Sequence, residues 1–135
     1  AQRVLRDASP QSGTDSRAAL NPLAMAEADV DLSVQQIHRD VADLMECVTR
    51  GEVPSAEMAL RTRRDQVMAA ERATRAVRIV AQGDGGAATN IDPALLDRVW
   101  RDVLTARMHE TNDVGLVLSV AGRHVLGINV DHLIW

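Results

Sequence analysis

Residues 33–50 have the sequence SVQQIHRDVADLMECVTR, and the fold prediction begins from this stretch. Its apolar side chains recur at spacings of three and four residues: Val34, Ile37, Val41, Leu44, Met45 and Val48. This is the period of an amphipathic α-helix, whose apolar side chains share one face. Gly51 and Pro54 follow, and both residue types end helices. The stretch therefore predicts an amphipathic helix over about residues 33–50.

The segment that follows predicts a longer helix over about residues 55–82, because no Gly or Pro interrupts it. Its weakly apolar, Ala-rich face consists of Leu60, Val67, Ala70, Thr74, Val77 and Ala81. Its other sides carry Arg61, Arg63, Arg64, Asp65, Glu71, Arg72, Arg75 and Arg78. Charged runs of this kind usually form a solvated face with pairs between residues four apart. We therefore expect these charges to lie on the surface.

Two shorter helices are predicted after it. Asp92 is suited to be the N-cap of one and Pro93 its first helical residue. The apolar stripe of that helix consists of Leu96, Val99, Trp100, Val103, Ala106 and His109. The last helix runs over about residues 113–126, and Gly127 is placed to end it.

The remaining N-terminal segment, residues 9–32, is predicted to be mostly loop, because it is polar at its start and contains Pro10, Gly13 and Pro22. Nothing in the chain alternates with period two over a useful length. The predicted fold is therefore all-α, an up-down four-helix bundle forming a single domain over residues 1–135, in which sequential neighbours are antiparallel.

Composition supports this fold class and excludes several functions. The chain has 135 residues, of which 46% are hydrophobic, with no Phe or Tyr and with Trp100 and Trp135 as its only aromatic residues. A core of Ala, Leu, Val, Ile and Met suits helices better than sandwiches or barrels. The formal net charge of −4 and the lack of a long basic run argue against nucleic-acid binding. Cys47 is the single cysteine, so no disulfide framework is possible. No membrane span is visible in the sequence, and a cytoplasmic location is the default expectation.

Few residues carry chemistry by themselves. The four histidines, His38, His109, His124 and His132, do not form a metal-binding pattern. His109 stands at the end of a predicted helix, where an isolated histidine usually acts as a cap that complements the helix dipole. The sequence GDGG at residues 83–86 would allow a close approach to a phosphate, although a flexible turn between helices is the simpler interpretation.

Residues 96–127, LDRVWRDVLTARMHETNDVGLVLSVAGRHVLG, resemble the last helices of the acyl-CoA dehydrogenase-like flavoproteins, in particular the flavin-dependent monooxygenase branch. In that branch the motif L-x-R-x-W-R-D is followed by a histidine near the helix end and then by A-G-R-x-x-L-G. The matching residues are Leu96, Arg98, Trp100, Arg101, Asp102, His109, Ala121, Gly122, Arg123, Leu126 and Gly127. The glutamate base of true acyl-CoA dehydrogenases has no assignable counterpart, which favours the monooxygenase branch.

The resemblance implies the C-terminal four-helix bundle of a larger flavoenzyme. It implies a homo-oligomer, a dimer or tetramer, that acts on a small-molecule substrate without nucleic-acid or membrane partners. FAD or FMN would be bound by the full-length protein and not by the isolated domain, which would be inactive alone. His109 matches the histidine that lines the active site, where it would act by deprotonating a phenol or by stabilising a flavin peroxide. Gly85 and Gly86 match the turn near the flavin diphosphate of a neighbouring subunit.

Two further expectations follow from the resemblance. Arg98, Arg101 and Asp102 are expected to be structural and to form salt bridges between helices, and Trp100 to be a core anchor. A bundle normally covered by other domains should also expose apolar surface and self-associate when isolated. The leading hypothesis is thus the C-terminal domain of a flavin-dependent oxidoreductase. The alternative is a non-catalytic helical oligomerisation or interaction module.

Overall fold

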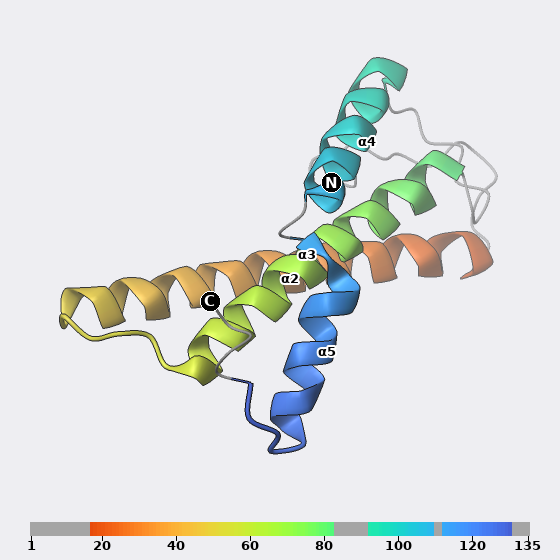
Figure 1. Cartoon of the computed structure of the whole chain (residues 1–135). Helices are drawn as coiled ribbons and strands as arrows, with labels where there is room; N and C mark the ends of the chain where they lie inside the picture. Colours follow the sequence, from red (N-terminus) through yellow and green to blue (C-terminus); the bar gives the residue numbers. More distant parts are fainter. Residues whose placement is uncertain (1–16, 83–91, 110–111, 131–135) are drawn as a thin grey trace.

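The computed structural model describes residues 17–82, 92–109 and 112–130 of the chain (Figure 1). Within these ranges the structure consists of four α-helices and their connections, without a strand. The helices are α2 (Arg17–Thr49), α3 (Ala56–Gln82), α4 (Pro93–Met108) and α5 (Val114–Val125). The predicted all-α fold of four helices is confirmed. No helix in the described part of the chain has the length and apolar character needed to cross a membrane.

Helix α3 is the centre of the arrangement, since the other three helices all pack against it. Helices α2 and α3 form an antiparallel hairpin, and α4 and α5 lie against opposite ends of α3 (Figure 1). At the C-terminal end of α3, Val80 packs against Leu95 and Val99 of α4 and against Leu23 of α2. At its N-terminal end, Leu60 forms a buried cluster with Val120 of α5 and with Val130. The core is therefore a series of small clusters strung along α3.

Helix α2 begins at Arg17, so the prediction of a mostly irregular segment over residues 9–32 is wrong for residues 17–32. Residues 9–16 lie outside the described residues. Pro22 lies inside the helix, where proline removes a hydrogen bond and costs about 3 kcal/mol or more. Tertiary packing offsets this cost, because Ala26 and Val30 are buried against Ala76 of α3. The segment around Pro22 is therefore helical because it packs against a helix about 50 residues away in sequence, although proline disfavours a helix locally.

The glycines predicted to end the first and the last helix are confirmed in detail. Gly51 and Gly127 have φ angles of +69° and +73°, in the left-handed region that favours glycine. After α2, the amide of Glu52 donates a 3.0 Å hydrogen bond to the carbonyl of Cys47, and Ile128 makes the same contact with Arg123 after α5. This pattern is a Schellman motif at each helix end.

The starts of the last two helices are capped by aspartates. The Asp92 carboxylate accepts a 3.0 Å hydrogen bond from the amide of Ala94, and Pro93 is the first helical residue, as predicted. The Asp113 carboxylate accepts a 2.9 Å hydrogen bond from the amide of Leu116. Local sequence therefore determines where α4 and α5 begin.

The apolar stripe predicted for α2 coincides only partly with the face that packs on α3. The fully buried positions of α2 are Ala26, Val30, Ser33, Asp40 and Cys47. Val34, Ile37 and Leu44 are half-buried, whereas Val41, Met45 and Val48 are 54%, 61% and 64% exposed. The apolar surface of α2 is thus wider than the part that α3 covers.

Candidate functional site

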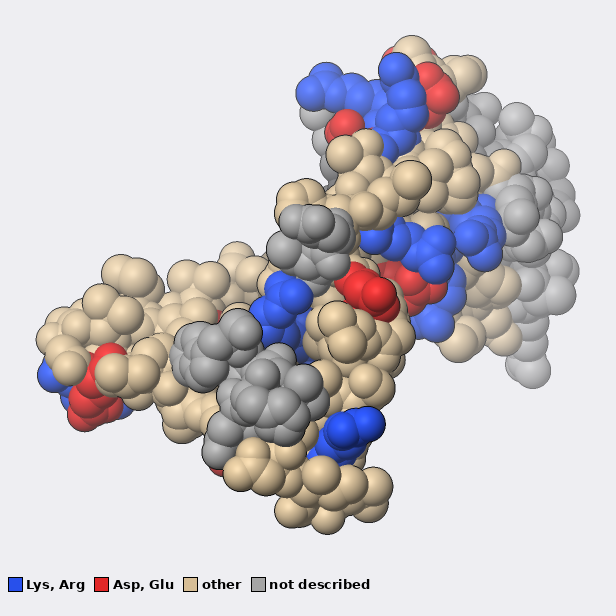
Figure 2. All heavy atoms as spheres, in the orientation of Figure 1, with Lys and Arg blue, Asp and Glu red and all other residues tan. Residues whose placement is uncertain are grey.

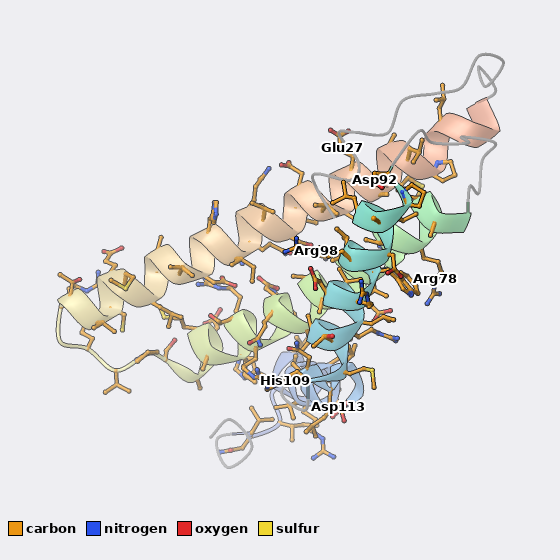
Figure 3. All side chains as sticks on the ribbon, turned by 90° about the horizontal axis from the view of Figure 1, so that it is seen from above. Glu27, Arg78, Asp92, Arg98, His109 and Asp113 are labelled. Atoms are coloured by element: carbon orange, nitrogen blue, oxygen red, sulfur yellow. The ribbon has the colours of Figure 1, made fainter. Side chains whose placement is uncertain are left out.

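His109 is the residue that directly follows α4. It is the C-cap of that helix, with φ −63° and ψ 133°, and its side chain is exposed. Figure 3 shows it at the junction of α4, α5 and α3. The predicted position at a helix end is therefore confirmed. The chain leaves helical geometry at this residue, so the helix ladder alone does not fix the residues that follow it.

Asn112 links the end of α4 to α3. Its backbone amide donates a 2.7 Å hydrogen bond to the carbonyl of His109. Its side-chain Nδ2 donates a 2.5 Å hydrogen bond to the carbonyl of Ala106, and its Oδ1 accepts a 3.1 Å bond from Nε2 of Gln66 on α3. Three hydrogen bonds thus surround the turn that contains His109.

A second link binds the last turn of α4 to the same helix. Nε of Arg107 lies 2.8 Å from Oε2 of Glu71, and this pair connects α4 to α3. Gln66 is in turn bound by Nη1 of Arg63, which donates a 3.0 Å hydrogen bond to its Oε1. His109 therefore lies between two separate attachments to α3. The sequence does not predict these contacts, because they join residues that lie 36 and 46 positions apart.

The other residues named by the sequence resemblance have different positions. Gly85 and Gly86 lie outside the described residues. Arg98, Arg101 and Asp102 are exposed on α4, and Arg101 pairs with Asp97 of the same helix at 3.0 Å. The expected salt bridge between helices is therefore wrong for Arg101, because its side chain reaches the carboxylate one turn earlier. Trp100, the expected core anchor, is half-buried.

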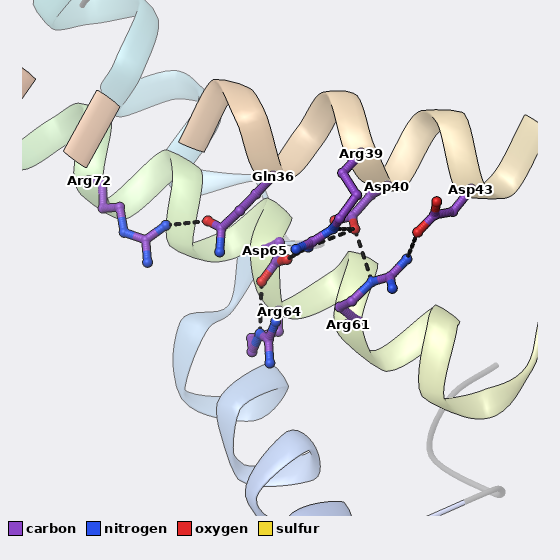
Figure 4. Close-up of polar contacts among 8 residues, drawn as sticks. All are labelled: Gln36, Arg39, Asp40, Asp43, Arg61, Arg64, Asp65 and Arg72. Atoms are coloured by element: carbon purple, nitrogen blue, oxygen red, sulfur yellow. Dashed lines mark hydrogen bonds and ion pairs between the residues drawn. The ribbon is translucent and has the colours of Figure 1, made fainter. Parts of the chain in front are cut away.

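A network of charged side chains crosses the interface between α2 and α3 (Figure 4). At its centre are Asp40 and Asp65, whose side chains are each 2% exposed. Nη2 of Arg39 bridges them, at 3.0 Å from Asp40 and 2.5 Å from Asp65. Arg61 lies 3.1 Å from Asp40 and also pairs with Asp43, and Arg64 lies 2.8 Å from Asp65. The prediction that the charges of residues 55–82 are all solvated is wrong at Asp65.

This network has the properties of a structural contact and not of a catalytic centre. Each buried carboxylate is bound by two guanidinium groups. The hydrogen bond from Arg39 to Asp40 raises the pKa of the Arg39 guanidinium, with Asp65 contributing in the same direction. No group of His, Cys, Asp and Glu side chains in the described residues could hold a metal ion. The sequence contains one signal for the buried face, since Ser33, Asp40 and Cys47 recur every seven residues.

An open groove of 330 Å³ lies between α2 and α3. Its lining is mostly apolar and consists of Val30, Ser33, Val34, Ile37, His38, Ala69 and Ala73. Figure 2 shows charged side chains over the middle of the molecule and over α4, whereas α5 and the turn after it carry few. The chain therefore exposes apolar surface at both α2 and α5, where Leu116, Val125 and Leu126 are exposed.

Comparison with known proteins identifies the family. The family model described as acyl-CoA dehydrogenase, C-terminal domain, matches residues 1–114. The chain belongs to this family. The helical domain and its acyl-CoA dehydrogenase-like relationship, inferred from residues 96–127, are confirmed. The matched region includes His109 and Asn112, and it ends as α5 begins.

Within this family the chain is similar to flavin-dependent monooxygenases. It is 34% identical over 109 residues to the oxygenase subunit HsaA of a flavin-dependent monooxygenase from Rhodococcus jostii, strain RHA1, covering 80% of this chain and 28% of that protein. It is 29% identical over 106 residues to HsaA from Mycobacterium tuberculosis, covering 78% of this chain and 27% of that protein. The chain thus spans less than a third of the length of these relatives.

Solved structures give the same relationship. The structure of 3-HSA hydroxylase from Rhodococcus sp. RHA1 aligns with a TM-score of 0.71 and 32% identity, covering 86% of this chain and 30% of that one. The HsaA monooxygenase from M. tuberculosis aligns with a TM-score of 0.70 and 29% identity, covering 87% of this chain and 31% of that one. Both the fold and the monooxygenase branch of the family agree with the sequence prediction.

Proposed function

We propose that this chain is the C-terminal domain of a flavin-dependent monooxygenase, in which it builds the oligomer and contributes His109 to the flavin and substrate pocket. The observation that carries this proposal is its similarity, in sequence and in fold, to the HsaA oxygenases. A single helical domain of this kind has no complete active site, so the remaining parts of the enzyme would supply the rest of the pocket. The isolated domain would therefore be inactive.

His109 fits the role of a pocket residue. Its ring is exposed, while Asn112 binds its backbone carbonyl at 2.7 Å, so the side chain can contact a group held by other parts of the protein. Histidine side chains exchange protons near neutral pH, and the ring could accept the proton of a substrate hydroxyl group such as a phenol. A bound FAD or FMN would supply the electron transfer to oxygen. Gly85 and Gly86 would lie near its diphosphate, a role that rests on the sequence resemblance alone.

Oligomerisation is supported by the exposed apolar surface of α2. Val41, Met45 and Val48 follow one another along the helix, and the groove lined by Val34 and Ile37 continues the same surface. We call these five residues the α2 stripe. Exposed apolar patches of this kind mark interaction sites in proteins that do not aggregate. We propose that a second copy of the chain covers the α2 stripe.

The catalytic assignment is tested by His109→Ala in the full-length flavoenzyme. We expect kcat for substrate hydroxylation to fall by about 10² to 10⁴-fold, the usual contribution of a general acid or base. Flavin content and the helical fold should remain unchanged, because His109 is exposed and does not belong to a core cluster. The matched control is His124→Ala, which removes an exposed histidine near the end of α5. Unchanged turnover in His109→Ala would contradict the assignment.

A non-catalytic helical interaction module is the second candidate. The observation that favours it is the amount of exposed apolar surface on α2 and α5. This candidate predicts that self-association persists while His109→Ala has no effect on any flavin-dependent reaction. The native mass of the protein that contains this chain also distinguishes the monooxygenase from the interaction module. A monooxygenase requires a polypeptide with a mass far above 14.7 kDa.

A further inference from the structure

We infer that Asn112, oriented by Gln66, is a positioning residue for His109. This inference rests on the proposed role of His109 for its functional meaning, but its structural content can be tested separately. The carbonyl of His109 accepts a 2.7 Å hydrogen bond from the Asn112 amide, and the side chain of Asn112 binds both α4 and α3. One residue thus connects the backbone of His109 to the two helices beside it.

Arg63, Gln66, Asn112 and Ala106 are joined in series by hydrogen bonds, and the direction of these bonds is fixed at both ends of the series. Arg63 can only donate, so it fixes Oε1 of Gln66 toward itself and leaves Nε2 of Gln66 pointing at Asn112. The carbonyl of Ala106 can only accept, so it fixes Nδ2 of Asn112 toward α4 and leaves Oδ1 pointing at Gln66. Both amide groups therefore have one orientation. The four groups form a single directed chain from Arg63 through Gln66 and Asn112 to Ala106.

The side chain at position 112 must be a short primary amide to do this. An aspartate would keep the acceptor for Gln66 and lose the donor for Ala106, and an alanine would lose both. At position 66, a glutamate would keep the acceptor for Arg63 and lose the donor for Asn112. Asn112→Asp and Gln66→Glu therefore each break one hydrogen bond of the series, whereas alanine at position 112 breaks two.

The hydrogen bonds of the Asn112 side chain position the turn at His109, and they are not needed to hold α4 on α3. The ion pair between Arg107 and Glu71, at 2.8 Å, joins α4 to α3 independently of Asn112. The N-terminal half of α4 packs through Leu95, Leu96 and Val99. Loss of the Asn112 side chain should leave α4 in place and release the turn at His109. Displacing a reacting group by about 1 Å can reduce turnover by about 10²-fold.

The experiment compares Asn112→Ala and Gln66→Ala in the full-length flavoenzyme, with histidine ring signals measured by ¹H–¹³C NMR. The His109 signal is assigned as the one that disappears in His109→Gln. We expect both variants to shift or broaden this signal, and kcat to fall about 10 to 100-fold with a much smaller change in KM. Asn112→Ala should cause no further loss when added to His109→Ala. Asn21→Ala, which removes an exposed asparagine of α2, is the control that should leave both readouts unchanged.

The outcomes separate the inference from the proposed function. An unchanged His109 signal in both variants would overturn the positioning role. A shifted signal, with turnover unaffected in these variants and in His109→Ala, would support the positioning role and overturn the catalytic one. Gln66→Ala removes the hydrogen bond from α3 to the Asn112 side chain. It therefore keeps the test valid if Asn112→Ala does not fold.

Discussion

At the scale of single residues, the contact between α2 and α3 depends on charges that water does not reach. The side chains of Asp40 and Asp65 are each 2% exposed, whereas the arginine side chains that bind them are 30–45% exposed. Burying an ionised carboxylate is unfavourable unless it is paired and hydrogen-bonded. The arginines offset that cost while keeping contact with solvent. Each buried carboxylate therefore depends on its partners more strongly than the partners depend on it.

Asp65→Asn should lower the free energy of unfolding by about 1.5–3 kcal/mol, because it weakens charge-assisted hydrogen bonds in a buried position. Urea denaturation measures this change. The matched control is Asp97→Asn, which weakens an exposed pair within α4 and should cost less than about 0.5 kcal/mol. Equal effects at the two positions would contradict a structural role for the buried network.

At the scale of helices, local sequence determines the ends better than it determines the faces. Asp92, Gly51 and Gly127 are found where the sequence predicts them, because capping involves residues only a few positions apart. The start of α2 and its buried face were predicted less well, because contacts with α3 decide both. The same limit applies to the site. His109 could be placed at a helix end from sequence, whereas its link to Gln66 spans residues 46 positions apart in sequence.

Two glycine substitutions should change stability in opposite directions. Gly127→Ala should destabilise the protein by about 1–2 kcal/mol, since φ is +73° and no neighbouring atom would compensate. Gly122→Ala lies within α5, where a Cβ would meet no atom within 4 Å, and should stabilise the protein by about 0.5–1 kcal/mol. Thermal unfolding of both variants measures the difference. The same sign for both would contradict this account of the end of α5.

At the scale of the whole molecule, the packing is open. Helices α4 and α5 each pack on α3 at a different end, and α4 has no fully buried residue. A chain of this size has enough apolar residues for one continuous core, yet the structure has small clusters instead. This architecture favours association with another surface, as in a domain that completes its core through a partner.

Replacing Val41 and Met45 together by glutamate should prevent self-association, because it places charge in the α2 stripe. Both residues are more than half exposed, so helicity should be retained. Light scattering should then give a mass near 14.7 kDa for this chain, and a larger mass for the unsubstituted chain. Gln35→Glu, on the polar side of α2, is the control and should associate normally. A monomer of the unsubstituted chain at high concentration would contradict the proposed interface.

The width of the apolar surface on α2 also has a consequence for how this sequence can change over time. Substitutions are constrained at positions that contact α3, and also at the α2 stripe if a partner covers it. Within residues 34–49 of α2, the exposed positions outside the α2 stripe, the groove and the charged network are Gln35, Ala42, Glu46 and Thr49, and these are left free to vary. In a deep mutational scan, the tolerant positions of residues 34–49 should therefore form a single thin line along this half of the helix.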